Sequence, residues 1–347
     1  MLIYGANGYT GTLIVELALE QGLRPQLAGR NPAKLKILAE RYGLQFSAFN
    51  LEDAAVLDQH FKDQRVVINC AGPFSQTFRQ VAAACLRQRI HYLDITGEIQ
   101  VFEGLAAMHR EALNAGVMLL PGVGFDVVPT DCLALHLKDR LPAANRLALA
   151  FRSSGGLSHG THRTMLEGLG RGGAIRRDGR IVPVEAAWKT RQVDFGDGRA
   201  CSVVSIPWGD VSTAWYSTGI PNIETYIAIK PSQIRSLRLS RHFGWLLRSP
   251  LVQWPLQRRI AASPQGPDAA TRRQTESLVW GEVCDANGQC VTSRLRCGNG
   301  YSFTSRSVVA AAKRVLNGEI KPGFQTPSRA FGIGFVLALG ARISDQP

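Results

Sequence analysis

The chain has 347 residues, of which 45% are hydrophobic, and it carries a formal net charge of +13. This length and composition exclude a disordered or low-complexity chain and predict two globular domains. The sequence contains neither an apolar run long enough to span a bilayer nor a signal-peptide pattern before the first apolar segment. We therefore expect a cytoplasmic protein.

The positive charge is confined to the second part of the chain. Residues 1–135 carry 11 Lys and Arg against 13 Asp and Glu, whereas residues 136–347 carry 29 against 14, a net of +15. Such a basic half predicts an anionic partner, either a carrier-bound acyl group or a lipid surface. We expect no nucleic acid partner, because no recognised binding motif is present. The seven Cys show no paired spacing, so we expect neither a disulfide framework nor a metal site.

The first element is a glycine-rich turn. Residues 2–4 are apolar and predict a strand, and the helical apolar period after Gly11 predicts a helix that ends near Gly22. A strand, a glycine turn and a helix N-terminus in this order form a site for the pyrophosphate of a dinucleotide, because the missing side chains let it approach the backbone. The expected cofactor contacts in this turn are Gly5, Asn7, Gly8, Tyr9, Thr10 and Gly11.

The end of the second strand predicts which dinucleotide binds. Residues 25–29 form this strand, and Arg30 and Asn31 follow it directly. An NAD site usually places a carboxylate here for the ribose 2′-hydroxyl, but no acid occurs from Gln21 to Ala39. A guanidinium matches the 2′-phosphate of NADP in charge and geometry. We therefore predict NADP(H) as the cofactor, with Arg30 and Asn31 beside it.

A β-α repeat continues to residue 135. The apolar periods predict helices at 32–42, 53–61, 76–89 and 98–115, and strands at 45–49, 65–70, 91–95 and 117–120. These elements predict an α/β domain, a Rossmann fold with a doubly wound parallel sheet, over residues 1–135. The loop after the strand at 65–70 should face the cofactor with Cys70, Ala71, Gly72 and Pro73.

The pattern changes near residue 146, where short alternating runs replace the β-α repeat. Strands are expected at 147–151, 200–206, 224–229, 277–283 and 290–297, with a helix at 163–169. These runs predict a mixed α+β substrate domain over residues 136–330. The tail, residues 331–347, is expected to pack back on the Rossmann domain.

These motifs resemble those of the saccharopine dehydrogenase-like oxidoreductases. The resemblance covers nearly the whole chain and rests on the glycine turn, Ala28–Arg30 and three further runs, at residues 69–74, 92–98 and 124–131. The subgroup that the chain resembles is that of the trans-acting enoyl reductases of lipid and polyketide synthesis. The resemblance implies an NADP-binding Rossmann domain with an inserted mixed sheet.

The expected activity is NADPH-dependent reduction of an activated C=C bond in an acyl thioester, lipid or polyketide-like substrate. Two alternatives stay open, a saccharopine-type C=N reductase and a non-catalytic NADP-binding adaptor at a lipid surface. The proton donor is also open. The candidates for it are Tyr92, Asp94, Asp126, Thr130, His159 and His162.

Residues 233–262 form a basic amphipathic insertion, in which apolar residues alternate with Arg235, Arg238, Arg241, Arg248, Arg258 and Arg259. It is either a packed helical segment with solvated arginines or an interfacial segment on anionic lipid or an acyl carrier protein. In the second case the protein would be peripheral to a membrane. A homodimer is a further open assembly.

Overall fold

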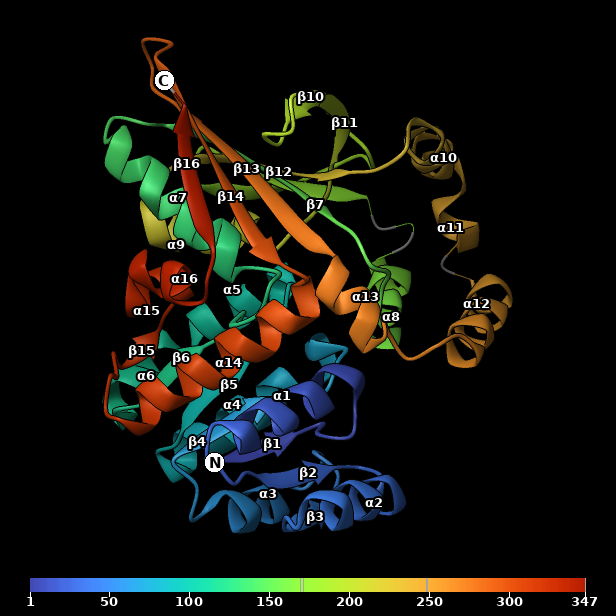
Figure 1. Cartoon of the computed structure of the whole chain (residues 1–347), viewed down its shortest axis with the longest axis vertical. Helices are drawn as coiled ribbons and strands as arrows, with labels where there is room; N and C mark the ends of the chain where they lie inside the picture. The colour runs from blue at the N-terminus through green and yellow to red at the C-terminus, as the bar shows by residue number, and fades with distance from the viewer. Residues whose placement is uncertain (169, 171, 248, 347) are drawn as a thin grey trace. The chain divides into compact units, whose positions relative to one another are not determined.

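The computed structural model describes residues 1–168, 170, 172–247 and 249–346. The chain folds into two compact units (Figure 1). The first unit comprises Met1–Val128 and Tyr301–Phe331, and the second comprises Pro129–Gly300 and the residues from Gly332 onward. Among the described residues, no helix is both long and apolar enough to cross a bilayer.

The first unit alternates strands and helices, as the sequence predicts. Its strands are β1 (Leu2–Tyr4), β2 (Gln26–Gly29), β3 (Phe46–Ala48), β4 (Val66–Asn69), β5 (His91–Asp94), β6 (Met118–Leu120) and β15 (Gly323–Phe324). Its helices are α1 (Tyr9–Glu20), α2 (Pro32–Tyr42), α3 (Ala54–Phe61), η1 (Phe74–Gln76), α4 (Phe78–Gln88), α5 (Ile99–Ala107), α6 (His109–Ala115), α14 (Gly300–Leu316) and α15 (Pro327–Phe331).

Within the described residues, these strands form a seven-stranded sheet in the order β15-β6-β5-β4-β1-β2-β3. Every pairing in it is parallel. Val66, Val67 and Ile68 of β4 are fully buried, as expected for a central strand covered by helices on both faces. The order reverses between β1 and β4, so the carboxyl ends of these two strands form the edge where such sheets bind ligands.

Two details of the first unit differ from the sequence prediction. The helix expected at 98–115 is broken at Met108 into α5 and α6. The division of the chain also differs from the expected boundary at residue 135, because the first unit ends at Val128 and residues 301–331 return to it and add the strand β15 beside β6. The pairing of β15 is long-range, and β15 is only two residues long, so no local pattern marks it.

The second unit contains the mixed sheet. Its strands are β7 (Arg146–Ser153), β8 (Gly173–Arg177), β9 (Arg180–Val184), β10 (Thr190–Asp194), β11 (Ala200–Ser205), β12 (Asn222–Ala228), β13 (Glu276–Cys284), β14 (Cys290–Gly298) and β16 (Arg342–Gln346). Its helices are α7 (Val128–Arg140), α8 (His159–Gly168), α9 (Asp210–Thr218), α10 (Pro231–Ser240), η2 (Arg241–Phe243), α11 (Gly244–Leu247), α12 (Pro250–Ala262), α13 (Ala269–Gln274) and α16 (Gly334–Ala338).

The main path of this sheet, over its described residues, is β10-β11-β12-β7-β13-β14-β16, with β8 attached to β12 and β9 attached to β8. The pair β12 and β7 is parallel and the other pairs are antiparallel, which confirms the expected mixed sheet. The helix α7 packs on it, since a Cβ atom at Gly281 of β13 would lie 2.6 Å from Leu137. Close approach of this helix therefore requires a glycine in the strand.

The predicted location of the C-terminal tail is also wrong. Instead of packing on the Rossmann domain, β16 pairs antiparallel with β14 of the second unit. Arg140 helps to hold it, because its guanidinium donates to the Gln346 carbonyl at 2.8 Å and lies 3.3 Å from the Asp345 carboxylate. The strand β16 is mostly polar, with Arg342, Ser344 and Asp345 exposed, so no apolar pattern indicates which sheet it joins.

The sequence predicts no disulfide framework, but one pair of cysteines is joined. Cys284 and Cys290 are directly opposite in the register of the β13–β14 hairpin and are joined by a disulfide. The pairing depends on the turn between the strands, so counting and spacing cysteines does not reveal it. The other five are free, and Cys85, Cys132 and Cys297 are buried.

Candidate cofactor and acid site

The glycine turn lies between β1 and α1 and is built as a dense backbone cradle. Gly5 has φ +82°, and a Cβ atom there would lie 2.8 Å from the Ala71 nitrogen. A Cβ atom at Gly11 would lie 2.4 Å from the Gly5 carbonyl oxygen. Both positions require glycine, because any side chain would push α1 and the loop after β4 away from the end of β1.

The start of α1 suits an anion. Gly8 is the N-cap residue, and over the described residues of this first turn the helix has neither a side-chain cap nor an acidic residue. The first amides of a helix lack intrahelical acceptors and carry a partial positive charge. The cradle therefore fits the pyrophosphate of a dinucleotide, and Gly5, Gly8, Tyr9, Thr10 and Gly11 are the residues that would surround it.

Arg30 follows β2 at the neighbouring strand end. Its side chain is exposed, and its charge opposes the burial that raises the pKa of Tyr4 at the end of β1 to about 12. Asn31 caps α2 by accepting a hydrogen bond from the Lys34 amide at 3.0 Å. The Asn7 side chain reaches toward the same strand end, because a Cβ atom at Gly29 would lie 3.2 Å from Asn7 Oδ1. The predicted cofactor residues of β1 and β2 thus meet at one edge.

The loop after β4 is held by Asn69, which is not among the predicted site residues. Asn69 is fully buried, accepts a hydrogen bond from the Ala71 amide at 3.1 Å and donates to the Thr77 hydroxyl at 2.9 Å. The Gly72–Pro73 peptide is cis. Burial raises the pKa of the Cys70 thiol far above its usual value, which argues against a reactive thiolate.

Glu98 joins this loop to the loop after β5. Its carboxylate accepts hydrogen bonds from the amides of Phe74 and Ser75, both at 2.9 Å. Glu98 was not among the predicted site residues, although its position directly after a strand-end glycine is a usable signal. Such a charge-assisted pair of bonds fixes the entrance of η1 relative to β5.

Tyr92 and Asp94 form a buried hydrogen-bonded pair at the end of β5. The Tyr92 hydroxyl donates to Asp94 Oδ2 at 2.7 Å, and Asp94 Oδ1 accepts from the amides of Thr96 and Gly122 at 3.0 and 2.8 Å. Burial raises the pKa of Asp94 to about 6 and raises that of Tyr92 well above its usual value. The Asp94 carboxylate therefore links the loop after β5 to the loop after β6, and the Tyr92 hydroxyl helps to hold this carboxylate in place.

Two substitutions of Asp94 test whether its hydrogen bonds, and not only the volume of its side chain, stabilise the protein. We expect Asp94→Ala to lower the free energy of unfolding by about 3 kcal/mol, since it leaves a buried hydroxyl and two amides without their acceptor. Asp94→Asn should cost only about 1 kcal/mol, because its carbonyl oxygen can still accept both amide bonds and its amide can face the Tyr92 oxygen. Urea denaturation measures both values, and equal losses for the two variants would contradict the assigned bonds.

Asp126 lies in the loop after β6, beside the loop after β5. A Cβ atom at Gly97 would lie 3.1 Å from Asp126 Oδ2, so the carboxyl group covers this glycine. Burial raises the pKa of Asp126 to about 7, and the Glu98 carboxylate adds to the shift. A group with this pKa exchanges protons near neutral pH, which is a property of general acids.

The helix α14 completes the first unit around this edge. Tyr301 packs edge-on against Tyr9 of the glycine turn, with ring centroids 5.1 Å apart. The Thr304 hydroxyl accepts from the Phe125 amide at 2.9 Å, next to Asp126. The sequence predicts that these residues belong to the other domain, so neither is among the predicted site residues.

The remaining proton-donor candidates belong to the second unit. Thr130 is buried in α7. The His159 ring lies 2.7 Å from the Ser263 carbonyl oxygen, and the His162 ring lies 3.1 Å from the Ser158 carbonyl oxygen. These bonds give both rings a function in holding loops around α8. Among the described residues, no cluster of His, Cys, Asp and Glu could hold a metal ion.

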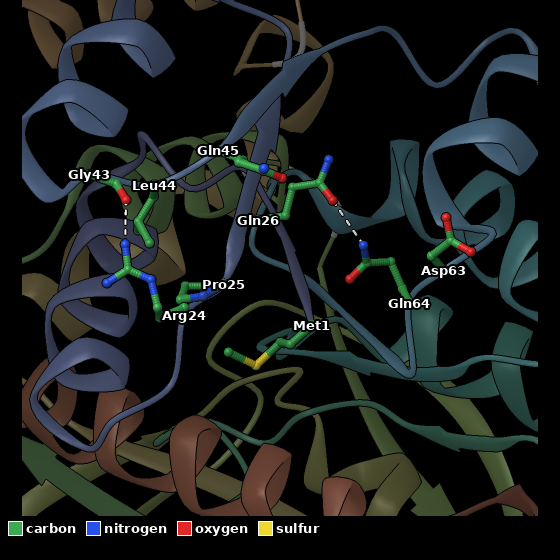
Figure 2. A pocket seen from close by; sticks show the side chains of 9 residues that line it. All are labelled: Met1, Arg24, Pro25, Gln26, Gly43, Leu44, Gln45, Asp63 and Gln64. Carbon is green, nitrogen blue, oxygen red and sulfur yellow. Dashed lines mark hydrogen bonds between the residues drawn. The ribbon is translucent and has the colours of Figure 1, made fainter.

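A cavity of about 430 Å³ lies at the opposite edge of the first sheet (Figure 2). It is lined by Met1, Arg24, Pro25, Gln26, Gly43, Leu44, Gln45, Asp63 and Gln64. These residues lie at or just before the amino ends of β1, β2, β3 and β4, so the cavity contains none of the predicted cofactor residues. The chemistry of the glycine cradle, unlike that of this cavity, fits a dinucleotide.

Comparison with known proteins agrees with this geometry. Residues 1–120 match the model of the saccharopine dehydrogenase NADP binding domain. A saccharopine dehydrogenase-like oxidoreductase of Mus musculus is 27% identical over 203 residues, 51% of this chain and 47% of the relative. A trans-acting enoyl reductase of Mycobacterium ulcerans is 28% identical over 148 residues, 40% of this chain and 35% of the relative. The chain spans about half the length of the curated relatives it matches.

The fold comparison covers the whole chain. Apo saccharopine dehydrogenase (L-Glu forming) from Saccharomyces cerevisiae superposes with a TM-score of 0.63 and 15% identity, over 100% of this chain and 99% of that one. A parallel sheet with a glycine cradle at the carboxyl end of its first strand is the arrangement of dinucleotide-binding domains. In agreement with this, residues 1–120 match the NADP binding domain of saccharopine dehydrogenase, and about half of the chain is similar to saccharopine dehydrogenase-like oxidoreductases.

Proposed function

We propose that this protein is an NADPH-dependent reductase of an activated carbon–carbon double bond in an acyl thioester, lipid or polyketide-like substrate. The observation that carries the proposal is the cradle at Gly5, Gly8 and Gly11 with Arg30 at the next strand end. When bound, the cofactor would supply a hydride. The residues of the cradle would bind and orient it.

The choice of substrate rests on charge and on the relatives. The excess of basic residues in 136–347, a net of +15, favours an anionic carrier such as a phosphopantetheine or coenzyme A thioester. The trans-acting enoyl reductase relative supports reduction of C=C. The saccharopine dehydrogenase-like relatives make a C=N reductase the second candidate.

Asp126 is the proposed proton donor. Its carboxyl group lies at the carboxyl edge of the first sheet, and its pKa of about 7 leaves much of it protonated at neutral pH. Glu98 lies close enough to raise that pKa and is itself held by two amides. The proposed function of Glu98 is to position the loop after β4 and to raise the pKa of Asp126.

An NADPH-oxidation screen tests the proposed function. The purified protein is mixed with NADPH and, in turn, with 2-enoyl thioesters and with keto-acid and amine pairs, and a variant with a disrupted cradle, Gly11→Val, serves as the blank. Oxidation with enoyl thioesters alone supports the proposal. Oxidation with the keto-acid and amine pairs alone supports the second candidate. Cofactor binding without turnover of either class favours the non-catalytic adaptor.

Arg30 should set the preference for NADPH. A guanidinium without a phosphate partner gains nothing from NADH, and a charge-assisted contact contributes ~1.5–3 kcal/mol, so NADPH should bind about tenfold or more tightly than NADH. Arg30→Glu should abolish or reverse this preference. The control is Arg65→Glu, an equal charge change at an exposed residue that precedes β4. Equal binding of both cofactors by the unaltered protein would refute the assignment.

A further inference from the structure

The basic insertion, residues 233–262, lies between β12 and β13 and forms α10, η2, α11 and α12 along one side of the second unit (Figure 1). Between Thr225 and Pro267 the chain contains seven Lys and Arg but no Asp or Glu. The sequence leaves open whether this segment is packed or interfacial. The structure shows that it has two distinct faces.

The inner face is anchored to the second unit. Ile234 is buried against Ala187 and Val204, and Leu237 packs on the same cluster. The Arg241 guanidinium donates to the carbonyls of Ala186 and Ala187 at 2.6 and 2.8 Å and forms an ion pair with Glu185 at 2.7 Å. Arg241, which the sequence left open as either a solvated residue or a lipid contact, is thus a structural residue.

The end of the insertion is anchored through α12. The Gln253 side-chain amide donates to the carbonyl of Leu247 at 2.8 Å and to that of Leu166 in α8 at 3.4 Å. The backbones of Gly170 and Gly244 also touch, since a Cβ atom at Gly170 would lie 2.6 Å from the Gly244 oxygen. The insertion therefore has a defined orientation on its own unit.

The outer face is apolar and unusually exposed. The exposed fractions of five large side chains range from 49% for Phe243 to 86% for Leu251. The five are Leu239, Phe243, Trp245, Leu251 and Trp254. Met165 of α8, which packs against α12, is 58% exposed and adds to this outer face. Packing within the unit does not explain why these side chains face outward.

Exposed arginines flank these apolar residues. Arg235 and Arg238 are exposed on α10, and Arg258 and Arg259 are exposed on α12. The Arg258 guanidinium stacks over the Trp254 ring at 3.9 Å. Arg248 lies outside the described residues. Tryptophan beside arginine on an apolar face is the arrangement of segments that lie in the interface of a bilayer.

We infer that the outer face of the basic insertion docks on an anionic lipid surface, with Trp245, Leu251 and Trp254 at the acyl boundary and the four exposed arginines at lipid phosphates. A second copy of this chain is a poorer occupant, because two such basic faces would repel each other. An acidic carrier protein would satisfy the arginines but offers no acyl phase for the most exposed apolar side chains. The inference does not depend on the proposed reductase activity.

The test is sedimentation of the full chain with vesicles, without cofactor or substrate. Vesicles of phosphatidylcholine are compared with vesicles that also contain phosphatidylglycerol, at low and high salt. Each basic residue near an anionic surface strengthens binding by about fivefold, so changing Arg235, Arg238, Arg258 and Arg259 to Gln should weaken binding by about a hundredfold or more. High salt should weaken the binding of the unaltered protein in the same direction.

Two matched variants make the result specific. Changing Arg110, Arg180, Arg199 and Arg342 to Gln removes the same charge from exposed positions outside the insertion and should change binding by less than tenfold. Changing Trp245, Leu251 and Trp254 to Ser should abolish binding while thermal unfolding is unchanged, because these side chains are exposed.

Absence of binding to anionic vesicles would overturn the inference. An affinity for these vesicles that changes neither with salt nor with the four Arg→Gln substitutions would also overturn it. Salt-sensitive dimerisation or carrier-protein binding through the same residues, without vesicle binding, would assign the surface to that partner instead.

Discussion

Replacing Gly11 with Val should abolish NADPH binding and destabilise the first unit. The new Cβ atom would lie 2.4 Å from the Gly5 oxygen and 3.0 Å from the Ala6 Cα, both backbone atoms of the same turn. Because backbone atoms have little freedom to yield, α1 must move away from β1, and overpacking of this kind costs typically ~1–3 kcal/mol. We expect an affinity loss of more than about a hundredfold, which corresponds to roughly two 1.4 kcal/mol steps.

The comparison with Gly8 distinguishes folding from binding. A Cβ atom at Gly8 would lie 3.2 Å from the Gly5 oxygen, and Gly8 has an ordinary φ of −75°. Gly8→Val should therefore lower the stability of the cofactor-free protein less than Gly11→Val but still block the approach of a phosphate. The control Gly334→Val adds the same side chain where no atom lies within 4 Å. Normal NADPH binding by both turn variants would place the phosphate site elsewhere.

Replacing Asp126 with Asn should lower turnover of the substrate found by the NADPH screen by about 10²–10⁴-fold, the usual contribution of a general acid. The affinity for NADPH should change little, because Asp126 lies after β6 and the cradle lies after β1. Asp63→Asn, at an exposed position in the same unit, is the control. A loss of less than tenfold would remove Asp126 from the mechanism.

The dependence on pH gives an independent measurement. The acid must carry its proton, and the pKa of Asp126 is about 7, so kcat/KM for the unaltered protein should be level below pH 7 and fall as the pH rises above it. Glu98→Gln removes a like charge and should move this fall to lower pH. In Asp126→Asn the fall should be absent. If Asp126 had only a structural function, the pH profile of kcat/KM for the residual activity of Asp126→Asn would be the same as that of the unaltered protein.

Local patterns in the sequence determined the first unit from β1 to β6. The apolar period, the helix-capping residues and the spacing of Gly5, Gly8 and Gly11 each depend on residues within a few positions of one another. The structure confirms the helix 32–42 without change, with Asn31 at its N-cap and Gly43 in the left-handed conformation at its end. It also confirms the strand and loop order that brings Arg30 and the glycine cradle to one sheet edge.

The features that only the tertiary structure decided are long-range pairings. The helix α14 and the strand β15 return to the first unit far along the chain from β6, at residues 300–316 and 323–324, while β16 joins the second sheet. Which sheet a short segment joins depends on the edge that is free in the folded chain, and no local period records this. For the same reason, local patterns in the sequence do not predict Thr304 and Tyr301 as part of the site.

Burial also decided the chemistry of the acids. Asp94, Glu98 and Asp126 all lie near the ends of predicted strands. In the folded chain, Asp94 accepts three hydrogen bonds, Glu98 accepts bonds from two amides, and the pKa of Asp126 is raised to about 7. Likewise, Arg241 and Arg235 belong to one basic pattern, yet Arg241 is bonded to the second unit while Arg235 is exposed. The sequence determined which groups are present, and packing determined their charge and access, because desolvation and partners exist only in the folded chain.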